Sequence, residues 1–143
     1  MKTQLGITVL GLFVVAGFAS HATGGDSKSK KTGLEGTWQS VKKDSRVQQL
    51  KIVGNTIEVT IGGNVHKGTF KLKNKENPLQ IDIKIITSPS KRFKGKTALG
   101  IYDFQGETLR WCSSQPGRKR RPSQFKKIMG DALLILGSFK KKK

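Results

Sequence analysis

Apolar residues alternate with polar ones along most of the chain after residue 34, and this period of two is the feature that most constrains the fold. Successive side chains of a strand point to opposite faces, whereas the apolar face of a helix recurs every 3.6 residues. No window of about a dozen residues after residue 34 has the helical spacing. The sequence therefore predicts a domain built from β-strands.

The segment LKIVGNTIEVTI shows how two of these strands pair, because a two-residue loop determines which residues face each other. With Gly54-Asn55 as the loop, Ile52 is opposite Ile57 and Leu50 is opposite Val59. Opposed residues share a face of the sheet. This hairpin therefore has one apolar side, which we expect to face the core.

The next hairpin is predicted in TIGGNVHKGTFKL, with Gly63-Asn64 as its loop. Ile61 is then opposite His66, and Ile57 is opposite Phe70. The apolar face of the first hairpin continues through the second. A register wrong by one residue would place these side chains on the solvent face, so the two hairpins support each other.

A third hairpin is predicted in ALGIYDFQGETLRWCS, with Gln105-Gly106 as its loop. Gly100 is then opposite Trp111, so that the indole covers the bare backbone of the glycine. The residues expected to face inward are Ala98, Tyr102, Phe104, Leu109 and Trp111, with Tyr102 opposite Leu109 and with Arg110 and Cys112 on the other side.

Eight strands are predicted, at about 35–42, 47–53, 56–62, 65–73, 79–86, 97–104, 107–114 and 132–139. Hairpins outnumber long crossovers in this series. Short antiparallel strands joined by tight turns favour an all-β fold, an eight-stranded antiparallel up-and-down barrel, in which closure removes the sheet edges. A two-sheet β-sandwich is the alternative.

The start of the chain has the pattern of a secretory signal peptide, predicted for residues 1–22. A basic residue precedes an apolar run from Leu5 to Phe18, which is shorter than the about 20 residues that a membrane span needs. We expect an exported protein, periplasmic or extracellular, without a transmembrane segment after cleavage. The remaining organisation is predicted as a flexible linker at 23–33, a barrel domain at 34–139 and a basic tail at 140–143.

Several segments, in order along the chain, resemble the small exported lipocalin-like domains of planctomycete bacteria. They are LEGTWQSV, KGTFKL, LQIDI, GKTALGIYDFQGETLRWC and PGRKRRPSQF. The resemblance implies a signal peptide, a lipocalin-like barrel and an unassigned biochemical role, and it implies no catalytic residues. Lipocalins commonly carry an arginine near the final strand that packs on the tryptophan of the first segment, here Trp38. In this chain that strand ends in Phe139 and lysines.

Catalytic chemistry has little support in the sequence. The domain has one histidine, His66, one cysteine, Cys112, and scattered acidic residues, with no H-x-H and no C-x-x-C. A zinc site or a catalytic group needs several such side chains together. We therefore expect a protein that is not an enzyme and has no metal or cofactor. Cys112 is predicted to be a small apolar strand residue, although a lone cysteine can also act as a nucleophile or link two chains.

Ligand binding inside the barrel is better motivated. An eight-stranded barrel is just wide enough to fill with side chains or to hold one small ligand. An apolar or amphipathic ligand would contact aromatic walls, with a polar group at the rim. The alternative, in which the rings only pack the interior, remains open. The candidate ligand-binding residues are Trp38, Phe70, Tyr102, Trp111 and His66.

Positive charge supports a different class of partner. The chain has 28 lysines and arginines against 9 acidic residues, a formal net charge of +19. Basic loops bind polyanions by releasing counterions, so nucleic acid, acidic polysaccharide or an anionic membrane surface is the alternative partner. No recognisable nucleic-acid module accompanies this charge, so specific nucleic-acid binding is not expected. The candidate polyanion-binding residues are Lys91, Arg92, Lys94, Lys96, Arg118, Lys119, Arg120 and Arg121.

Overall fold

The computed structural model describes residues 32–126 and 135–143. The predicted signal peptide and residues 23–31 of the predicted linker lie outside these ranges. The described residues form no helix, and hence none that could cross a membrane. They form eight strands in chain order: β1 (Gly36–Ser40), β2 (Val47–Val53), β3 (Thr56–Ile61), β4 (Asn64–Lys73), β5 (Leu79–Thr87), β6 (Thr97–Gln105), β7 (Thr108–Ser113) and β8 (Ile135–Lys141).

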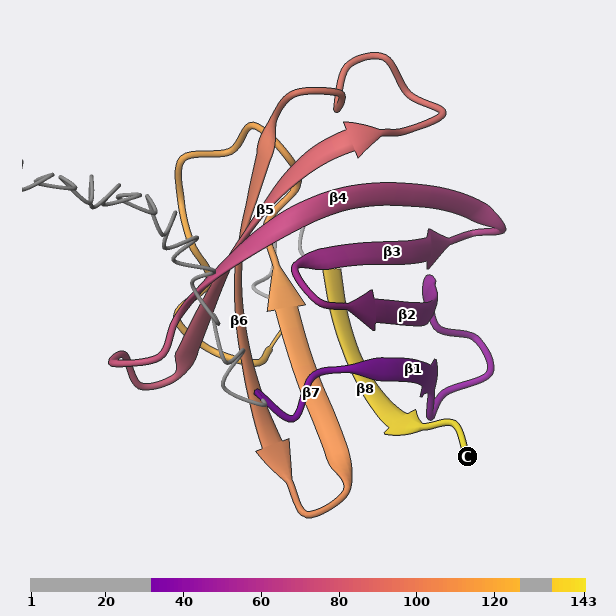
Figure 1. Cartoon of the computed structure of the whole chain (residues 1–143), viewed down its shortest axis with the longest axis vertical. Helices are drawn as coiled ribbons and strands as arrows, with labels where there is room; N and C mark the ends of the chain where they lie inside the picture. The colour runs from indigo at the N-terminus through magenta and orange to yellow at the C-terminus, as the bar shows by residue number, and fades with distance from the viewer. Residues whose placement is uncertain (1–31, 127–134) are drawn as a thin grey trace, which may run out of the picture.

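The strands form a closed antiparallel barrel (Figure 1). Each strand pairs with the next one, and β8 returns to pair with β1 through Trp38 opposite Lys141 and Ser40 opposite Phe139. The predicted up-and-down barrel is confirmed, and the sandwich alternative is excluded. The predicted basic tail is wrong for Lys140 and Lys141, because both belong to β8 and help to close the barrel.

The first predicted hairpin has the expected register, and the other two are displaced by two residues. In the second, Ile61 is opposite Asn64 and His66 is opposite Val59. Its loop is Gly62-Gly63 instead of Gly63-Asn64. Because the shift is even, every side chain stays on its predicted face.

The third hairpin shows the same displacement. Tyr102 is opposite Trp111, Gly100 is opposite Ser113, and the loop begins at Gly106. In all three hairpins the first loop residue is a glycine in the left-handed region, with φ of 56°, 54° and 58° at Gly54, Gly62 and Gly106. Primed hairpin turns need that conformation at their first position, where glycine adopts it without steric cost.

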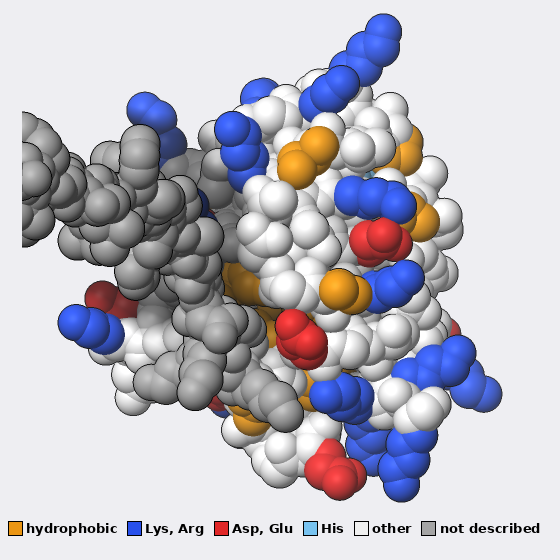
Figure 2. Space-filling view, viewed as in Figure 1, with side chains coloured by type: hydrophobic (Ala, Val, Ile, Leu, Met, Phe, Trp, Pro, Cys, Tyr) orange, Lys and Arg blue, Asp and Glu red, His pale blue; other side chains and the backbone are white. Residues whose placement is uncertain are grey.

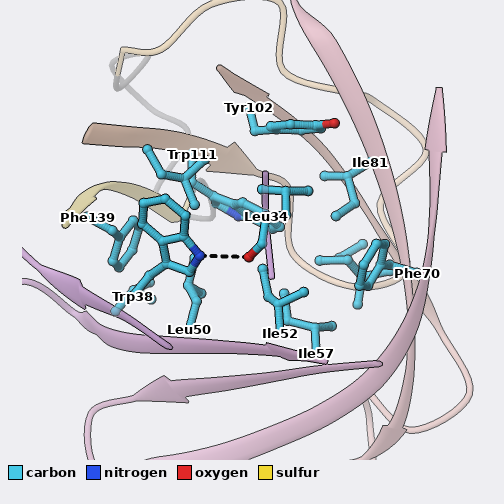
Figure 3. Close-up of a cluster of buried hydrophobic side chains, with 14 of the residues drawn as sticks. Leu34, Trp38, Leu50, Ile52, Ile57, Phe70, Ile81, Tyr102, Trp111 and Phe139 are labelled. Atoms are coloured by element: carbon cyan, nitrogen blue, oxygen red, sulfur yellow. Dashed lines mark hydrogen bonds between the residues drawn. The ribbon is translucent and has the colours of Figure 1, made fainter. Parts of the chain in front are cut away.

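The barrel interior is filled by apolar side chains from all eight strands (Figure 3). Leu34 enters from the segment before β1, and its carbonyl oxygen accepts a 2.7 Å hydrogen bond from Trp38 Nε1. Phe104 keeps its predicted side but is 38 % exposed, because it stands next to the β6–β7 turn. The buried cluster consists of Leu34, Trp38, Val47, Leu50, Ile52, Ile57, Phe70, Ile81, Ile83, Ile85, Ala98, Tyr102, Leu109, Trp111 and Phe139.

Trp38 connects the N-terminal segment with the closing strand. Its ring packs at 6.0 Å from that of Phe104, and Lys141 Nζ lies 5.7 Å from its centroid. A lysine of β8 therefore lies over the indole of Trp38. The contact joins β1 to β8 at the seam of the barrel.

Trp38→Ala should reduce the free energy of unfolding by about 3–5 kcal/mol, because the indole is 4 % exposed and its removal leaves a cavity. Urea unfolding followed by circular dichroism measures the loss. Phe104→Ala, in the same aromatic group but partly exposed, is the control and should cost less. A loss near zero for Trp38→Ala would contradict its place at the seam.

Candidate functional site

The up-and-down topology sorts the connections between strands into two ends of the barrel. Because neighbouring strands run in opposite directions, every second connection lies at the same end. We call one of them the loop end: it holds residues 41–46, 62–63, 88–96 and the beginning of the connection after β7, residues 114–120. The other end holds the tight turns after β2, β4 and β6. In Figure 1 the β5–β6 connection is at the top and the β6–β7 turn at the bottom.

The loop end is strongly basic. Among its described residues the acidic group is Asp44 alone. The opposite end has a more mixed charge, with Glu76 and Glu107 in its turns beside Lys75, and with Lys142 and Lys143 after β8. Figure 2 shows lysine and arginine side chains standing out at the top of the molecule, over the β5–β6 connection. The exposed cations of the loop end are Lys42, Lys43, Arg46, Lys91, Arg92, Lys94, Lys96, Arg118, Lys119 and Arg120.

A groove of about 240 Å³ lies between the β5–β6 connection and the start of the β7–β8 connection. Arg92, Phe93 and Lys96 line one side, and residues 115–118 line the other. Two predicted basic clusters, which are more than twenty residues apart in the sequence, therefore meet here. We call this hollow the basic groove.

Backbone hydrogen bonds hold both walls of the basic groove. Lys96 N–H donates to Phe93 O at 3.1 Å, and Arg118 N–H donates to Gln115 O at 3.1 Å, so each wall contains a closed turn. Gly117 N–H donates to Thr97 O at 2.9 Å and ties the second wall to β6. The groove is thus an ordered feature of the backbone.

Gly117 lets the two walls approach each other. Its φ of 91° is strained for any residue with a side chain, and a Cβ would lie 2.7 Å from Lys96 Cδ. The aliphatic stem of Lys96 therefore runs across this glycine. Lys96 is thereby one of the residues that line the groove.

The cations of the basic groove are free of acidic partners among the described residues. The ion pairs of the described part of the chain all lie outside the groove lining: they are Lys67–Glu58, Lys73–Asp82, Arg110–Asp103 and Arg121–Asp82. Arg92 lies over the ring of Phe93 at 4.9 Å, and its Nη2 donates to Gln115 Oε1 at 3.4 Å. Neither contact neutralises its charge. Cations gathered without counter-charges raise the local concentration of anions.

His66 lies on the inner side of the loop end. Its Nδ1 is 3.0 Å from Ser88 Oγ, and its ring packs at 6.4 Å from that of Phe93. Burial lowers the pKa of His66, which favours the neutral imidazole. The predicted rim histidine thus lies next to a residue that lines the basic groove.

The other predicted ligand-binding residues belong to the core. Trp38, Phe70, Tyr102 and Trp111 are buried, and the Tyr102 and Trp111 rings pack at 6.4 Å (Figure 3). Tyr102 donates to Asn74 Oδ1 at 3.2 Å, and burial raises its pKa. These rings contact one another and the aliphatic core. A ligand between them stays a prediction.

Arg121 differs from the other predicted polyanion-binding residues, because its guanidinium is already engaged. Nη1 donates to Gly100 O at 2.7 Å and to Ile81 O at 3.1 Å, and Nη2 pairs with Asp82. Burial alone would raise the pKa of Asp82, but the hydrogen bonds and charges of Arg121 and Lys73 outweigh it and lower that pKa. Arg121 therefore fastens the β7–β8 connection to the outside of β5 and β6.

Arg121→Gln should lower the free energy of unfolding by about 1.5–3 kcal/mol at neutral pH, through the loss of hydrogen bonds from a charged group. Because the pKa of Asp82 is lowered on folding, the part of this contribution that comes from the Asp82 pair is present above the ordinary value of 3.8 and is lost as the pH falls through the lower folded-state value. Urea titrations of both proteins across this range measure the difference. Arg120→Gln, at an exposed neighbour, is the control, and a difference that does not change with pH would contradict the pairing.

Cys112 is buried on the outer face of the barrel, opposite Ile101 on β6 and Leu136 on β8. It is a free thiol, and burial raises its pKa to about 11. A thiol that is neutral and covered is a poor nucleophile. The interpretation as a small apolar strand residue fits this position.

Iodoacetamide at about pH 8 should leave Cys112 unmodified in the native protein and alkylate it completely in urea, because the thiolate is both disfavoured and covered in the fold. Mass spectrometry after a timed quench measures the modified fraction. Equal rates in the two states would show that the thiol is accessible, contrary to the structure.

Three loop-end cations were not among the predicted site residues. Lys42, Lys43 and Arg46 lie in the β1–β2 connection, where the sequence shows only a short polar break between strands. These three residues can be assigned to the loop end only from the barrel topology. Because successive connections lie at alternate ends of the barrel, residues 41–46 belong to the same end as residues 88–96.

Comparisons with protein-family models, with curated proteins and with solved structures find no match to this chain. The resemblance to planctomycete lipocalin-like domains stays a prediction. Histidine, cysteine and acidic side chains in residues 32–126 and 135–143 form no group of three that could hold a metal ion. The geometry of the loop end is therefore the main guide to function.

Proposed function

We propose that the protein is an exported binding module that holds a polyanion on its loop end. The observation that carries the proposal is the excess of cations over acidic groups at the loop end. Exposed lysines and arginines from three connections gather at one end of the barrel, with Asp44 as the acidic residue among their described neighbours. Three acidic groups elsewhere, Glu58, Asp82 and Asp103, are paired with cations on the outside of the strands.

Polyanion binding at such a surface is driven by counterion release. A polymer with closely spaced negative charges carries condensed cations, and these are freed when lysines and arginines replace them. Binding of this kind weakens steeply as salt rises. Polyanion binding also needs little apolar contact. This suits a protein whose apolar side chains lie mainly inside the barrel and not on its surface.

A small apolar ligand in the barrel interior has weaker support. The side chains that would line its site, Trp38, Phe70, Tyr102 and Trp111, pack in one continuous buried cluster. The cluster also includes Leu34, which enters the barrel from the side opposite the loop end. Interior packing explains these residues without a ligand.

The protein should bind a heparin column and elute above about 0.15 M salt. A rim variant, Lys43→Gln with Lys91→Gln and Lys94→Gln, should elute earlier, because three exposed loop-end charges are lost.

The matched control is a strand variant, Lys51→Gln with Lys71→Gln and Lys84→Gln, which removes three exposed charges from the outside of β2, β4 and β5. It should elute close to the unmodified protein. Release of the unmodified protein below physiological salt, or equal shifts for the two variants, would contradict a binding site at the loop end.

A further inference from the structure

The basic groove brings three cations to one small hollow from two directions. Arg92 and Lys96 come from the β5–β6 connection, and Arg118 comes from the connection after β7. Resting on the function proposed above, we infer that the groove is a subsite for a tetrahedral monoester oxyanion, a sulfate or phosphate group, carried by an acidic polysaccharide. The rest of the loop end then binds the polymer through its other charges.

The number and direction of the donors favour a monoester. A sulfate or phosphate monoester has three terminal oxygens that point in different directions, whereas a phosphodiester in a nucleic-acid backbone has two. A guanidinium presents parallel N–H donors that match two oxygens of an oxyanion, and an ammonium acts as a compact charge. Arg92, Lys96 and Arg118 can therefore reach one monoester from both walls, whereas a diester leaves part of this donor set unused.

The aromatic residues of this region argue against a single-stranded nucleic acid. Proteins of that class stack bases on free aromatic faces. The aromatic residues in the described part of the loop-end connections and their continuation to residue 126 are Phe93 and Phe125. Arg92 lies over Phe93 at 4.9 Å, and Arg110 lies over Phe125 at 4.4 Å, so a cation already occupies a face of each ring.

The groove is also prepared for an anion before one binds. The Phe93–Lys96 and Gln115–Arg118 turns are closed by backbone hydrogen bonds of 3.1 Å, and the Lys96 stem lies against Gly117. Its cations have no carboxylate partner in the described residues that an incoming oxyanion would have to displace. Little ordering of the backbone is therefore required on binding, which strengthens the interaction.

The test measures binding of four fluorescent probes of matched net charge by anisotropy at physiological salt. A heparin oligosaccharide carries sulfate monoesters, a phosphomannan oligosaccharide carries phosphate monoesters, a hyaluronan oligosaccharide carries carboxylates, and a DNA duplex carries phosphodiesters. One or both monoester probes should bind about tenfold more tightly than hyaluronan or DNA. The comparison of heparin with phosphomannan then tells which monoester the groove takes.

The groove variant, Arg92→Gln with Lys96→Gln and Arg118→Gln, should lose this preference. Its affinity for the preferred monoester probe should fall about tenfold more than its affinity for DNA. The rim variant described above removes the same charge and should weaken all four probes by similar factors. Circular dichroism and thermal unfolding check that both variants fold, which is the expected result for exposed side chains.

The outcomes separate this inference from the proposed function. If the groove variant weakens the monoester and DNA probes by the same factor, the groove is only part of a general positive surface, and the inference fails while polyanion binding stands. Tighter binding of hyaluronan or DNA than of both monoester probes also overturns the inference. If no probe binds at physiological salt, the proposed function fails with it.

Discussion

The pairing of β8 with β1 is the constraint on which the rest of the structure depends. It closes the sheet through Trp38, Gln39 and Ser40, so the barrel has no unpaired edge. Every neighbouring pair in the closed ring is antiparallel, so strand directions alternate and each connection is assigned to one end. The meeting of the basic loops at one end is therefore a consequence of backbone topology. The same seam is supported from inside, where Trp38 meets the carbonyl group of Leu34 and the side chain of Lys141.

The sequence predicted the strands and their faces well because period-two alternation and glycine turns are local signals. Two hairpins were displaced by two residues because their turns offer more than one choice of loop. Around Gly62, three successive residues tolerate a left-handed backbone, and around Gly106 the loop can begin at the glycine or before it. The structure places the glycine first each time. An even displacement keeps each side chain on its predicted face of the sheet, so the core residues were predicted correctly although the register was not.

The loop end could be predicted only in part, because it depends on contacts between distant segments. Lys91 to Lys96 and Arg118 to Arg121 were recognisable as basic runs, but nothing local indicates that they form opposite walls of one groove. Arg121 is a second case in which a contact between distant segments is invisible in the local sequence. Its partner Asp82 is 39 residues away in the sequence, so a residue that looks like its basic neighbours is in fact a structural anchor. Likewise, the outer-face burial of Cys112 cannot be read from strand alternation.

The placement of the acidic residues explains why the loop end keeps its charge. Glu58, Asp82 and Asp103 all lie on the outside of strands, where rigid backbone holds them beside Lys67, Arg121 and Arg110. A strand fixes such cross-strand neighbours, so the few acidic groups neutralise cations there and hold the β7–β8 connection in place. The loop-end cations are left to solvent, where mutual repulsion is weakened by salt but not removed. A chain that uses three of its acidic groups to secure the barrel and leaves its loop-end cations without an ion pair in the described residues has a surface suited to an anionic partner. The basic groove is the hollow where cations from two of these connections meet.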